Sequence, residues 1–226
     1  MVTGGAGFIG SALVRHILKD TNHSVVNIDK LTYAGNLLSL KNVTNNSLYT
    51  FEQVDICDTS EIKRVFTQHQ PDTVIHLAAD SGLNFCHMNQ RDAFKNNVEA
   101  TFNILLACKK YNCKNVVAAS SMAAEKYNSI PSFYGFTKMS TENLFKTFNK
   151  IYGLNAAILR FSNIFGPYSK HKTSAIHKMI QCIFKKNEIF KIHGTGKQKR
   201  DFVYSIDVVA KTFKIFRKKR KKLIYE

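Results

Sequence analysis

The sequence has little of what a disulfide framework, a flexible linker or a membrane span requires. Its 226 residues include three prolines and no tryptophan, and no run of about 18 apolar residues could cross a bilayer. The five cysteines are odd in number and lack CxxC spacing, which argues for reduced thiols in a cytoplasmic protein and against a metal site. The glycine-rich start is unlike a secretory signal, so we expect no signal peptide.

Acidic residues are also scarce. The chain has 16 Asp and Glu against 33 Lys and Arg, a net charge of +17, and residues 216–222 form the densest basic run. Such an excess can mark a nucleic-acid-binding protein. Lysine is common throughout, however, which indicates a general bias spread over solvated surfaces. We therefore expect no nucleic-acid partner, whereas the positive field favours anionic ligands such as nucleotide diphosphates.

Short β-branched runs alternate with longer helical patterns through most of the chain. The expected strands lie at 24–28, 48–51, 73–77, 115–119 and 155–159, and the expected helices at 8–19, 92–111 and 138–152. This alternation predicts an α/β fold with a Rossmann-like, doubly wound parallel sheet. After about residue 165 the pattern loosens, and we expect a helix near 174–185, a strand near 189–192 and a helix at 205–216.

We expect a dinucleotide-binding domain at 1–165 and a partial substrate lobe at 166–226. Only Met1 and Val2 precede the first glycine turn, fewer than the roughly five residues of an ordinary strand. At the other end, Leu223–Tyr225 is patterned like the start of a strand. We expect the chain to be truncated at both ends.

A glycine-rich turn is the first functional motif. Gly4, Gly7 and Gly10 form G-x-x-G-x-x-G between an apolar start and a helix, with Phe8 and Ile9 inside the motif. The glycines allow a tight turn and close approach of the backbone to a pyrophosphate, whose charge then lies at a helix N-terminus. We take these five residues as part of a dinucleotide site.

An acidic residue follows at the spacing that such a site needs. Asp29 comes 19 residues after Gly10, where a carboxylate accepts hydrogen bonds from the adenosine ribose. An acid there repels a 2′-phosphate, so the cofactor is predicted to be NAD. Lys30 beside it argues against strict NAD preference.

A tyrosine and a lysine one helical turn apart form the second motif. In Tyr134-Gly-Phe-Thr-Lys138 the two side chains share a helix face. A nearby ammonium favours phenolate, so we expect Lys138 to lower the pKa of Tyr134 below its reference of about 10 and to create a base usable near neutral pH. Tyr-x-x-x-Lys occurs by chance in many helices, but beside a dinucleotide turn it indicates a nicotinamide-dependent enzyme.

Together the motifs resemble the extended short-chain dehydrogenase/reductase family, the NAD-dependent nucleotide-sugar epimerases and dehydratases. The resemblance covers nearly the whole chain. Residues 29–36 are most similar to dTDP-glucose 4,6-dehydratases, and 160–204 resemble dehydratases and UDP-sugar 4-epimerases equally. The motifs in the family's order are TGGAGFIG at 3–10, Asp55-Ile56, His76-Leu-Ala-Ala79, Asn97-Val98, Tyr134…Lys138, Arg160…Asn163…Gly166-Pro167 and Arg200-Asp-Phe-Val-Tyr204.

The resemblance implies roles for these residues. Lys138 would also hold the nicotinamide ribose, Ser121 would hydrogen-bond the reacting sugar oxygen, and Tyr134 would take its proton while hydride leaves the sugar C4. Asn163 and Arg200 would contact the nucleotide diphosphate of a UDP- or dTDP-hexose. The further residues implied to border the cofactor are Asp55, Ile56, Leu77, Ala78, Ala79, Ser81 and Asn97.

The sequence departs from dehydratases after the active-site serine. Dehydratases carry an Asp-Glu pair there, but this chain has Met122 and Ala123, and Glu125 is displaced by about two positions. The interval from Ser121 to Tyr134 is also shorter than usual in the family. We therefore predict a 4-epimerase-like enzyme; the alternatives are dTDP-glucose 4,6-dehydratase and a catalytically impaired NAD-binding remnant.

Two further predictions concern packing. His76 lies in an apolar run and is expected to be a core residue and not a ligand. Members of the family often dimerise through a four-helix contact, and the analogous surfaces here are the helices at 92–111 and 134–152, so a homodimer is possible.

Overall fold

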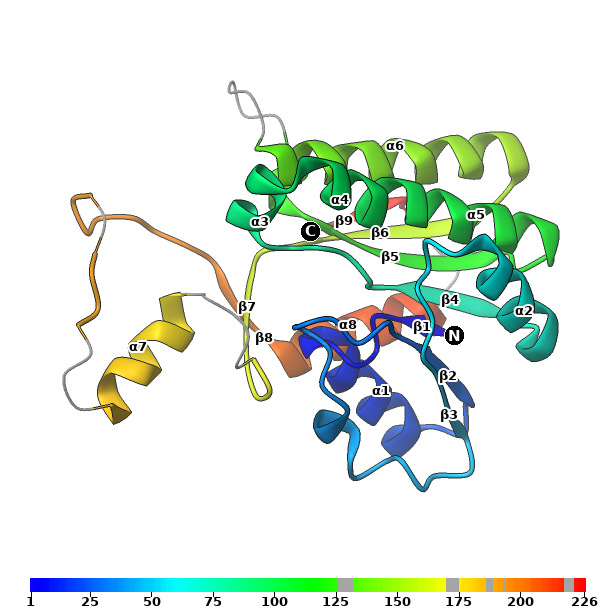
Figure 1. The fold of residues 1–226 in the computed structure, drawn as a ribbon, viewed down its shortest axis with the longest axis horizontal. Coiled ribbons are helices and arrows are strands. Elements are labelled where there is room, and N and C mark those ends of the chain that lie inside the picture. Colours follow the sequence, from blue (N-terminus) through cyan, green and yellow to red (C-terminus); the bar gives the residue numbers. More distant parts are fainter. Residues whose placement is uncertain (126–131, 170–174, 186–188, 193, 218–221) are drawn as a thin grey trace.

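The computed structural model describes residues 1–125, 132–169, 175–185, 189–192, 194–217 and 222–226 (Figure 1). Seven parallel strands form one sheet in the order β3-β2-β1-β4-β5-β6-β9, and β7 and β8 form a separate parallel pair. The strands are β1 (Val2–Thr3), β2 (Val25–Ile28), β3 (Tyr49–Glu52), β4 (Thr73–His76), β5 (Asn115–Ser121), β6 (Asn155–Phe161), β7 (Asn163–Phe165), β8 (Phe202–Tyr204) and β9 (Ile224–Tyr225).

Helices cover both faces of the large sheet, as Figure 1 shows. The helices α2, α5 and α6 pack beside one another on one face, and α1 and α8 pack together on the other. The helices are α1 (Phe8–Asp20), α2 (Thr59–His69), α3 (Leu83–Met88), α4 (Gln90–Phe94), α5 (Ala100–Lys110), α6 (Phe133–Tyr152), α7 (Ala175–Phe184) and α8 (Ser205–Arg217). This strand order and layering are those of a Rossmann-like α/β fold.

Two apolar cores follow from the alternation of side chains along the strands. In β6, Ala156 and Ile158 face the core under α2, α5 and α6, whereas Ala157 and Leu159 face the core under α1 and α8. Successive residues of a strand point to opposite faces, so a central strand that is covered on both sides must be apolar throughout. That requirement explains the continuous apolar runs in the sequence.

Most predicted elements are present within one to three residues of their expected bounds. The run at Leu223–Tyr225 does form a strand, because β9 pairs with β6 through Ile158 and Leu159. The strand expected near 189–192 is wrong: these residues have no regular secondary structure. The helix expected at 92–111 is interrupted by a π-helical turn at Lys95–Glu99 that separates α4 from α5.

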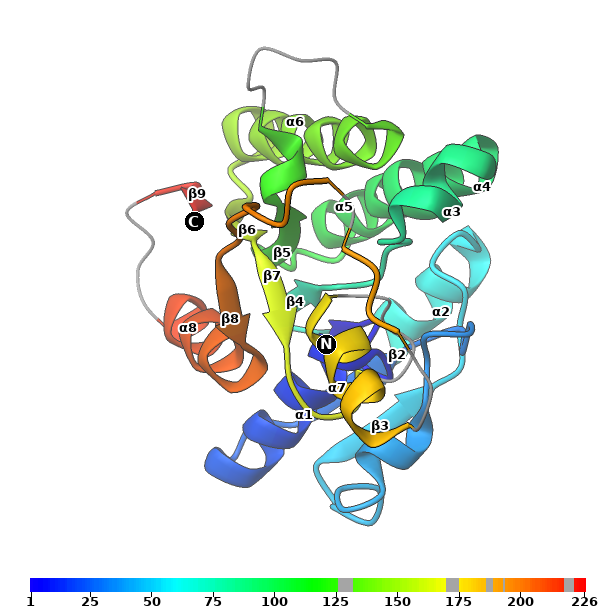
Figure 2. The same ribbon diagram turned by 90° about the vertical axis from the view of Figure 1, so that its left-hand side faces the viewer.

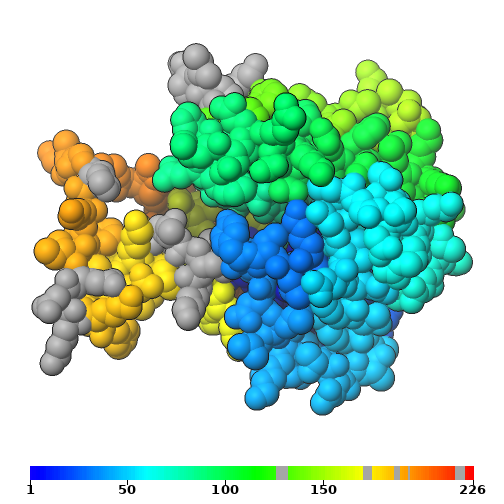
Figure 3. All heavy atoms as spheres, viewed as in Figure 1, coloured from blue at the N-terminus to red at the C-terminus, as the bar shows by residue number. Residues whose placement is uncertain are grey.

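The segment after β6 extends away from the sheet. β7 precedes α7 and β8 follows it, and α7 lies apart from the sheet in Figure 1, faces the viewer in Figure 2 and belongs to a projecting part of the molecule in the space-filling view of Figure 3. The chain then returns, because α8 packs on α1 and β9 joins the large sheet. The domain division at residue 165 stays a prediction. Among the described residues, no helix is both long and apolar enough to cross a membrane.

Candidate active site

The turn between β1 and α1 brings backbone segments into close approach. Gly4 has φ of +73°, in the left-handed region that favours glycine, and a Cβ on it would lie 2.7 Å from the Ala78 nitrogen. A Cβ on Gly10 would lie 2.1 Å from the Gly4 carbonyl oxygen. Larger residues at positions 4 and 10 would therefore fill the space between these backbone segments, which we call the glycine cradle.

The glycine cradle lies next to the N-terminus of α1. This helix begins at Phe8, directly after Gly7, and its first turn reads Phe-Ile-Gly-Ser, without an acidic side chain. The first amides of a helix, here those of Phe8, Ile9 and Gly10, have no acceptor inside the helix, and the helix dipole places partial positive charge there. The cradle and these amides fit a dinucleotide pyrophosphate.

Asp29 follows β2 and is held by two backbone amides. Its Oδ2 accepts a hydrogen bond from the Ala6 nitrogen at 3.0 Å, and its Oδ1 accepts one from the Leu31 nitrogen at 2.9 Å. Burial raises the pKa of this carboxyl above its ordinary value, although the two amides and the Lys30 ammonium act in the opposite direction. Each oxygen keeps a second lone pair that a ribose hydroxyl could use.

The Lys30 ammonium is engaged by two neighbours. Its Nζ lies 3.1 Å from Asp55 Oδ2 and 2.9 Å from Asn96 Oδ1. Burial favours the neutral form of Asp55, but hydrogen bonds from the Cys57 amide and from Lys30 hold the pKa of this carboxyl below its ordinary value. The cation that argued against strict NAD preference is thus paired with an acid. Ile56, next to Asp55, is buried.

Asn97 links the loop Leu77–Ser81 to the start of α6 through hydrogen bonds. Its Oδ1 accepts a hydrogen bond from the Asp80 nitrogen at 2.7 Å, and its Nδ2 donates to the Asp80 carbonyl at 3.0 Å and to Thr137 Oγ1 at 3.1 Å. Thr137 in turn donates to the Tyr134 carbonyl at 2.8 Å. A residue predicted to border the cofactor therefore also positions the helix that carries Tyr134.

His76 is buried and hydrogen-bonded at both ring nitrogens. Its Nε2 lies 2.9 Å from Thr101 Oγ1, which donates its own proton to the Asn97 carbonyl, and its Nδ1 lies 2.8 Å from Thr3 Oγ1. This pattern assigns the proton to Nε2. Burial, aided by the positive charge of Lys138, lowers the pKa of His76 to about 3. The prediction of a core histidine is confirmed.

The pH dependence of stability should report this burial. Because the pKa of His76 is lower in the folded chain than in the unfolded chain, the unfolded chain binds more protons between about pH 6.5 and pH 3. The contribution of neutral His76 to the free energy of unfolding should be complete above about pH 6.5. Below that pH the free energy of unfolding should decrease, by at most about 1.4 kcal/mol per pH unit from this group. Urea unfolding of wild type and His76→Gln at both ends of that range measures it. Equal pH slopes for the two proteins would contradict the assignment.

Ser121, Tyr134 and Lys138 converge at the end of β5. Ser121 is the last residue of β5, and its side chain hydrogen-bonds that of Tyr134 on α6. Lys138 is buried, donates from Nζ to the Ala119 carbonyl at 3.1 Å, and lies 6.0 Å from the centroid of the Tyr134 ring. The structure therefore places the three predicted catalytic side chains near one another, with the Tyr134 phenol hydrogen-bonded to Ser121 and the Lys138 ammonium 6.0 Å from its ring centroid.

The predicted direction of the Tyr134 pKa shift is wrong. Burial raises this pKa to about 12, the hydrogen bond with Ser121 lowers it, and Cys86 contributes a further small rise. A phenolate loses its hydration when the ring is enclosed, and this cost outweighs the favourable hydrogen bond with Ser121. Lys138, the expected cause of a lowered pKa, is not among the groups that shift it. The sequence spacing predicted a nearby cation correctly but contained no measure of enclosure.

Of the two residues predicted to bind substrate, Asn163 lies on β7 and Arg200 lies two residues before β8. Asn163 begins β7, where its backbone nitrogen and its Nδ2 contact the Asp201 carbonyl at 3.2 and 3.4 Å. Arg200, next to Asp201, is exposed and donates to the Lys199 carbonyl at 2.8 Å. Pairing of β7 with β8 therefore brings Asn163 and Arg200 to one end of this small sheet.

The residues after Ser121 form a short 3₁₀ turn, Met122–Ala124. Met122 and Ala123 carry no group that transfers a proton. Glu125 Oε1 lies 3.5 Å from the Arg160 guanidinium, and its buried Oε2 has no hydrogen-bond partner among the described residues. Residues 126–131, which make up much of the short interval before Tyr134, lie outside the described residues.

Three residues of the site were not predicted from the sequence. Thr3, Asn96 and Thr137 contact His76, Lys30 and Asn97, respectively. Thr3 and Thr137 lie inside the motifs at 3–10 and 134–138, and Asn96 adjoins Asn97, but the sequence assigned none of the three a contact. Their partners are 40 to 73 positions away, so their roles depend on the tertiary fold.

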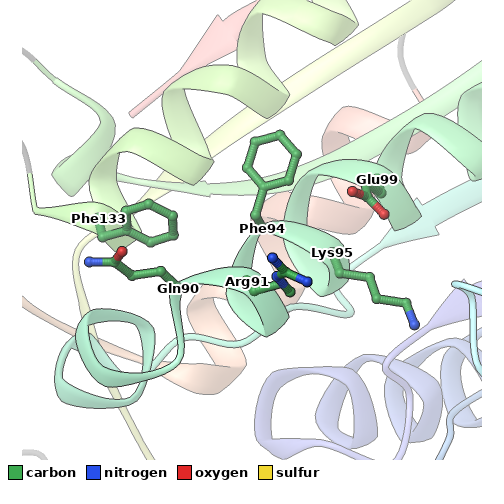
Figure 4. Close-up of a pocket in the computed structure, with 6 residues that line it drawn as sticks. All are labelled: Gln90, Arg91, Phe94, Lys95, Glu99 and Phe133. Carbon is green, nitrogen blue, oxygen red and sulfur yellow. The ribbon is translucent and has the colours of Figure 1, made fainter.

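A shallow hollow of about 420 Å³ lies outside this cluster (Figure 4). Phe94 and Phe133 supply apolar walls, and Phe133 directly precedes Tyr134. The other lining residues are Gln90, Arg91, Lys95 and Glu99. The hollow lies where α4 and the π-helical turn meet the start of α6, on the helices for which the sequence predicts a subunit contact.

Curated relatives of this chain act on nucleotide sugars by name. It is 35% identical to the dTDP-glucose 4,6-dehydratase of Salmonella typhimurium and 36% identical to that of Neisseria meningitidis, each over 92% of this chain. The chain spans 65% and 64% of the length of those two relatives.

Solved structures of both reaction types share the fold. The UDP-glucose 4-epimerase of Thermotoga maritima matches 99% of this chain and 74% of its own, with 28% identity and a TM-score of 0.87. The dTDP-glucose 4,6-dehydratase DesIV of Streptomyces venezuelae, solved with NAD bound, matches 99% and 73%, with 26% identity and a TM-score of 0.89. The family described as the NAD dependent epimerase/dehydratase family matches residues 1–226. The chain therefore belongs to the NAD-dependent epimerase/dehydratase family.

Proposed function

We propose that the chain oxidises C4 of a UDP- or dTDP-hexose transiently and returns the hydride to the opposite face, as a 4-epimerase does. The observation that carries this proposal is the convergence of Ser121, Tyr134 and Lys138 at the end of β5. NAD, when bound, would accept the C4 hydride. Gly4, Gly10 and Asp29 would hold it, because the glycine cradle fits a pyrophosphate and the fixed carboxylate fits a ribose diol.

The residues have separate tasks in this mechanism. Ser121 would hydrogen-bond the C4 oxygen and hold it near Tyr134. Tyr134 would take the hydroxyl proton as the C–H bond breaks and give it back when the hydride returns, so proton and electrons balance over the cycle. The Lys138 ammonium would favour the phenolate, and Arg200 would contact the substrate phosphates.

The residues after Ser121 favour epimerisation over dehydration. Loss of water across C5 and C6 needs an acid and a base, and Met122 and Ala123 supply neither. Glu125 is displaced by about two positions and contacts Arg160 through Oε1 alone, at 3.5 Å. The identity to curated dehydratases supports the other reaction, so dTDP-glucose 4,6-dehydratase activity is the second candidate.

Product analysis separates the candidates. The purified protein should convert UDP-glucose or dTDP-glucose, in the presence of NAD, to the C4-inverted hexose without loss of water. Nuclear magnetic resonance of the product distinguishes an inverted C4 from a 4-keto-6-deoxy sugar. A 4-keto-6-deoxy product would establish dehydration. Tight NAD binding without turnover of either sugar would identify a catalytically impaired NAD-binding remnant and contradict the proposal.

We also propose that the α5 and α6 faces pair two copies of the chain. Phe102 and Leu106 on α5 and Ile151 on α6 are 41%, 42% and 63% exposed, so these neighbouring helices present large apolar side chains that a second copy could cover. Leu106→Glu should convert a dimer to a monomer in sedimentation experiments. Ile183→Glu, on the exposed α7, is the matched control and should leave the dimer intact. A monomeric wild type would exclude the pairing.

A further inference from the structure

Helix α6 is joined to the end of β5 by one polar contact in each of three successive turns. Tyr134 meets Ser121, the Lys138 ammonium donates to the Ala119 carbonyl at 3.1 Å, and Glu142 accepts a hydrogen bond from Ser120 Oγ at 2.6 Å. Tyr134, Lys138 and Glu142 are four residues apart and so share one helix face. The first two contacts belong to the proposed catalytic residues, and the third does not.

The third contact is anchored to the next strand. Arg160 lies opposite Ser120 in the pairing of β5 with β6. Its Nε lies 2.9 Å from Glu142 Oε1, and a terminal nitrogen lies 2.9 Å from Glu142 Oε2. This bidentate pair fixes both the distance and the orientation of the two side chains. Glu142 is 2% exposed. The pair therefore ties α6 to two strands at once, one turn beyond Lys138.

The charges around the pair keep it ionised. Burial by itself would raise the pKa of Glu142, but hydrogen bonds from Arg160 and Ser120 hold it below its ordinary value. Arg160 also contacts Glu226 at 2.8 Å and Glu125 at 3.5 Å, and Lys146 lies 4.0 Å from Glu142. A fully ionised, bidentate pair has a narrower range of geometries than an apolar contact of the same size.

Stability alone is a weak reason to place such a pair here. Apolar residues of similar volume often replace a buried ion pair without loss of stability, whereas removal of one partner leaves an uncompensated charge. What an apolar contact cannot reproduce is the directional constraint. That constraint acts on the same helix face, and at the same strand end, as the proposed catalytic contacts.

We propose that Glu142 and Arg160 are positioning residues. They fix the rotation of α6 about its own axis and its distance from β5, and thereby hold Lys138 and Tyr134 opposite Ser121. This inference rests on the proposed function for its catalytic consequence. The geometric part does not depend on which sugar is the substrate.

The double variant Glu142→Leu with Arg160→Met tests the inference. It removes both charges, so the fold should be retained. It also removes the two hydrogen bonds between Arg160 and Glu142 that constrain the orientation of α6. A misplacement of reacting groups by about 1 Å can cost about 100-fold in rate. We expect kcat with UDP-glucose or dTDP-glucose to fall by about 10- to 100-fold, with KM and the Kd for NAD changed less than about 3-fold.

A crystal structure of the double variant gives a readout without substrate. We expect loss of the 3.1 Å contact between Lys138 Nζ and the Ala119 carbonyl and of the hydrogen bond between Ser121 and Tyr134. Arg64→Met is the matched control, because Arg64 contacts Glu52 and Glu61, each at 2.9 Å, on and beside α2. This control should change neither the contacts nor kcat.

The outcomes separate the two proposals. Wild-type kcat in the double variant, or retention of both contacts in its crystal structure, would overturn the positioning role. If the wild type turns over neither sugar, the proposed function fails, and the crystal structure still decides the geometric part. If the double variant does not fold, Glu142→Gln, which keeps the side-chain shape and removes its charge, takes its place with the same two readouts.

Discussion

Tyr134→Phe should lose about 100- to 10,000-fold of sugar oxidation while it keeps the affinity for NAD, because the substitution removes one hydroxyl and leaves the ring in place. The hydroxyl is the group that meets Ser121 and lies nearest the proposed proton-transfer path. Measurement of kcat with UDP-glucose and dTDP-glucose, together with calorimetric titration of NAD, separates chemistry from binding.

The pH dependence of the same reaction adds a second test. Enclosure raises the Tyr134 pKa to about 12, so the phenol is protonated at neutral pH. A base that must lose its proton first becomes more effective as pH rises toward its pKa, so kcat/KM should increase from about pH 6 to about pH 9. The residual activity of Tyr134→Phe should lack this increase.

The same helix offers a control for Tyr134→Phe. Tyr152 ends α6 and is 48% exposed, with the Lys109 ammonium 3.9 Å from its ring centroid. Tyr152→Phe removes a hydroxyl from the same kind of residue far from Ser121, and activity should stay at the wild-type level. Equal activity of Tyr134→Phe and wild type would refute the role of the phenol, whichever sugar is used.

Periodicity predicted the sheet because burial on both faces imposes apolar residues on every position of a central strand. The runs at 115–119 and 155–159 became β5 and β6 for this reason. The run at 189–192, in which Lys191 interrupts the apolar residues, was also expected to be a strand, yet no strand of the described residues pairs with it and it is without regular structure. A strand needs a neighbour for its backbone hydrogen bonds, and sequence periodicity does not show whether one is present.

The helix expected at 92–111 illustrates a different limit. Its apolar spacing continues through Lys95–Glu99, where the backbone adopts a π-helical turn. This turn presents Asn96 to Lys30 and to the Asp80 carboxylate, and Asn97 to the Asp80 backbone. π-Helical turns often occur at functional sites, and here the cause is the tertiary contacts of two polar residues, which local propensity does not encode.

The candidate site shows the same division between local and long-range information. The spacing of Gly4, Gly7 and Gly10 and of Tyr134 and Lys138 is local, and the structure places these residues as that spacing requires. The Tyr134 pKa depends on how much chain encloses the ring, which the spacing does not contain. The anchoring of Glu142 by Arg160 likewise joins α6 to β6 through the tertiary fold.

Gly10→Ala should abolish measurable NAD binding, because the turn has no room for one methyl group. A Cβ on Gly10 would lie 2.1 Å from the Gly4 carbonyl oxygen and 2.7 Å from the Gly5 Cα. Both are backbone atoms, so no flexible side chain can move aside, and α1 must shift relative to β1. That shift would displace the first-turn amides that face the pyrophosphate, and overpacking of this kind costs about 1–3 kcal/mol of stability as well.

Gly153→Ala separates the loss of binding from the loss of stability. Gly153 is the C-cap residue directly after α6, with φ of +65°, and a Cβ there would meet nothing within 4 Å. Alanine in this left-handed conformation should cost about 1 kcal/mol, comparable to the lower end of the range for Gly10→Ala, yet leave the cradle intact. Calorimetric titration of NAD and urea unfolding of both variants should therefore show similar destabilisation but binding only in Gly153→Ala. NAD affinity in Gly10→Ala equal to that of wild type would mean that the dinucleotide does not occupy the turn between β1 and α1.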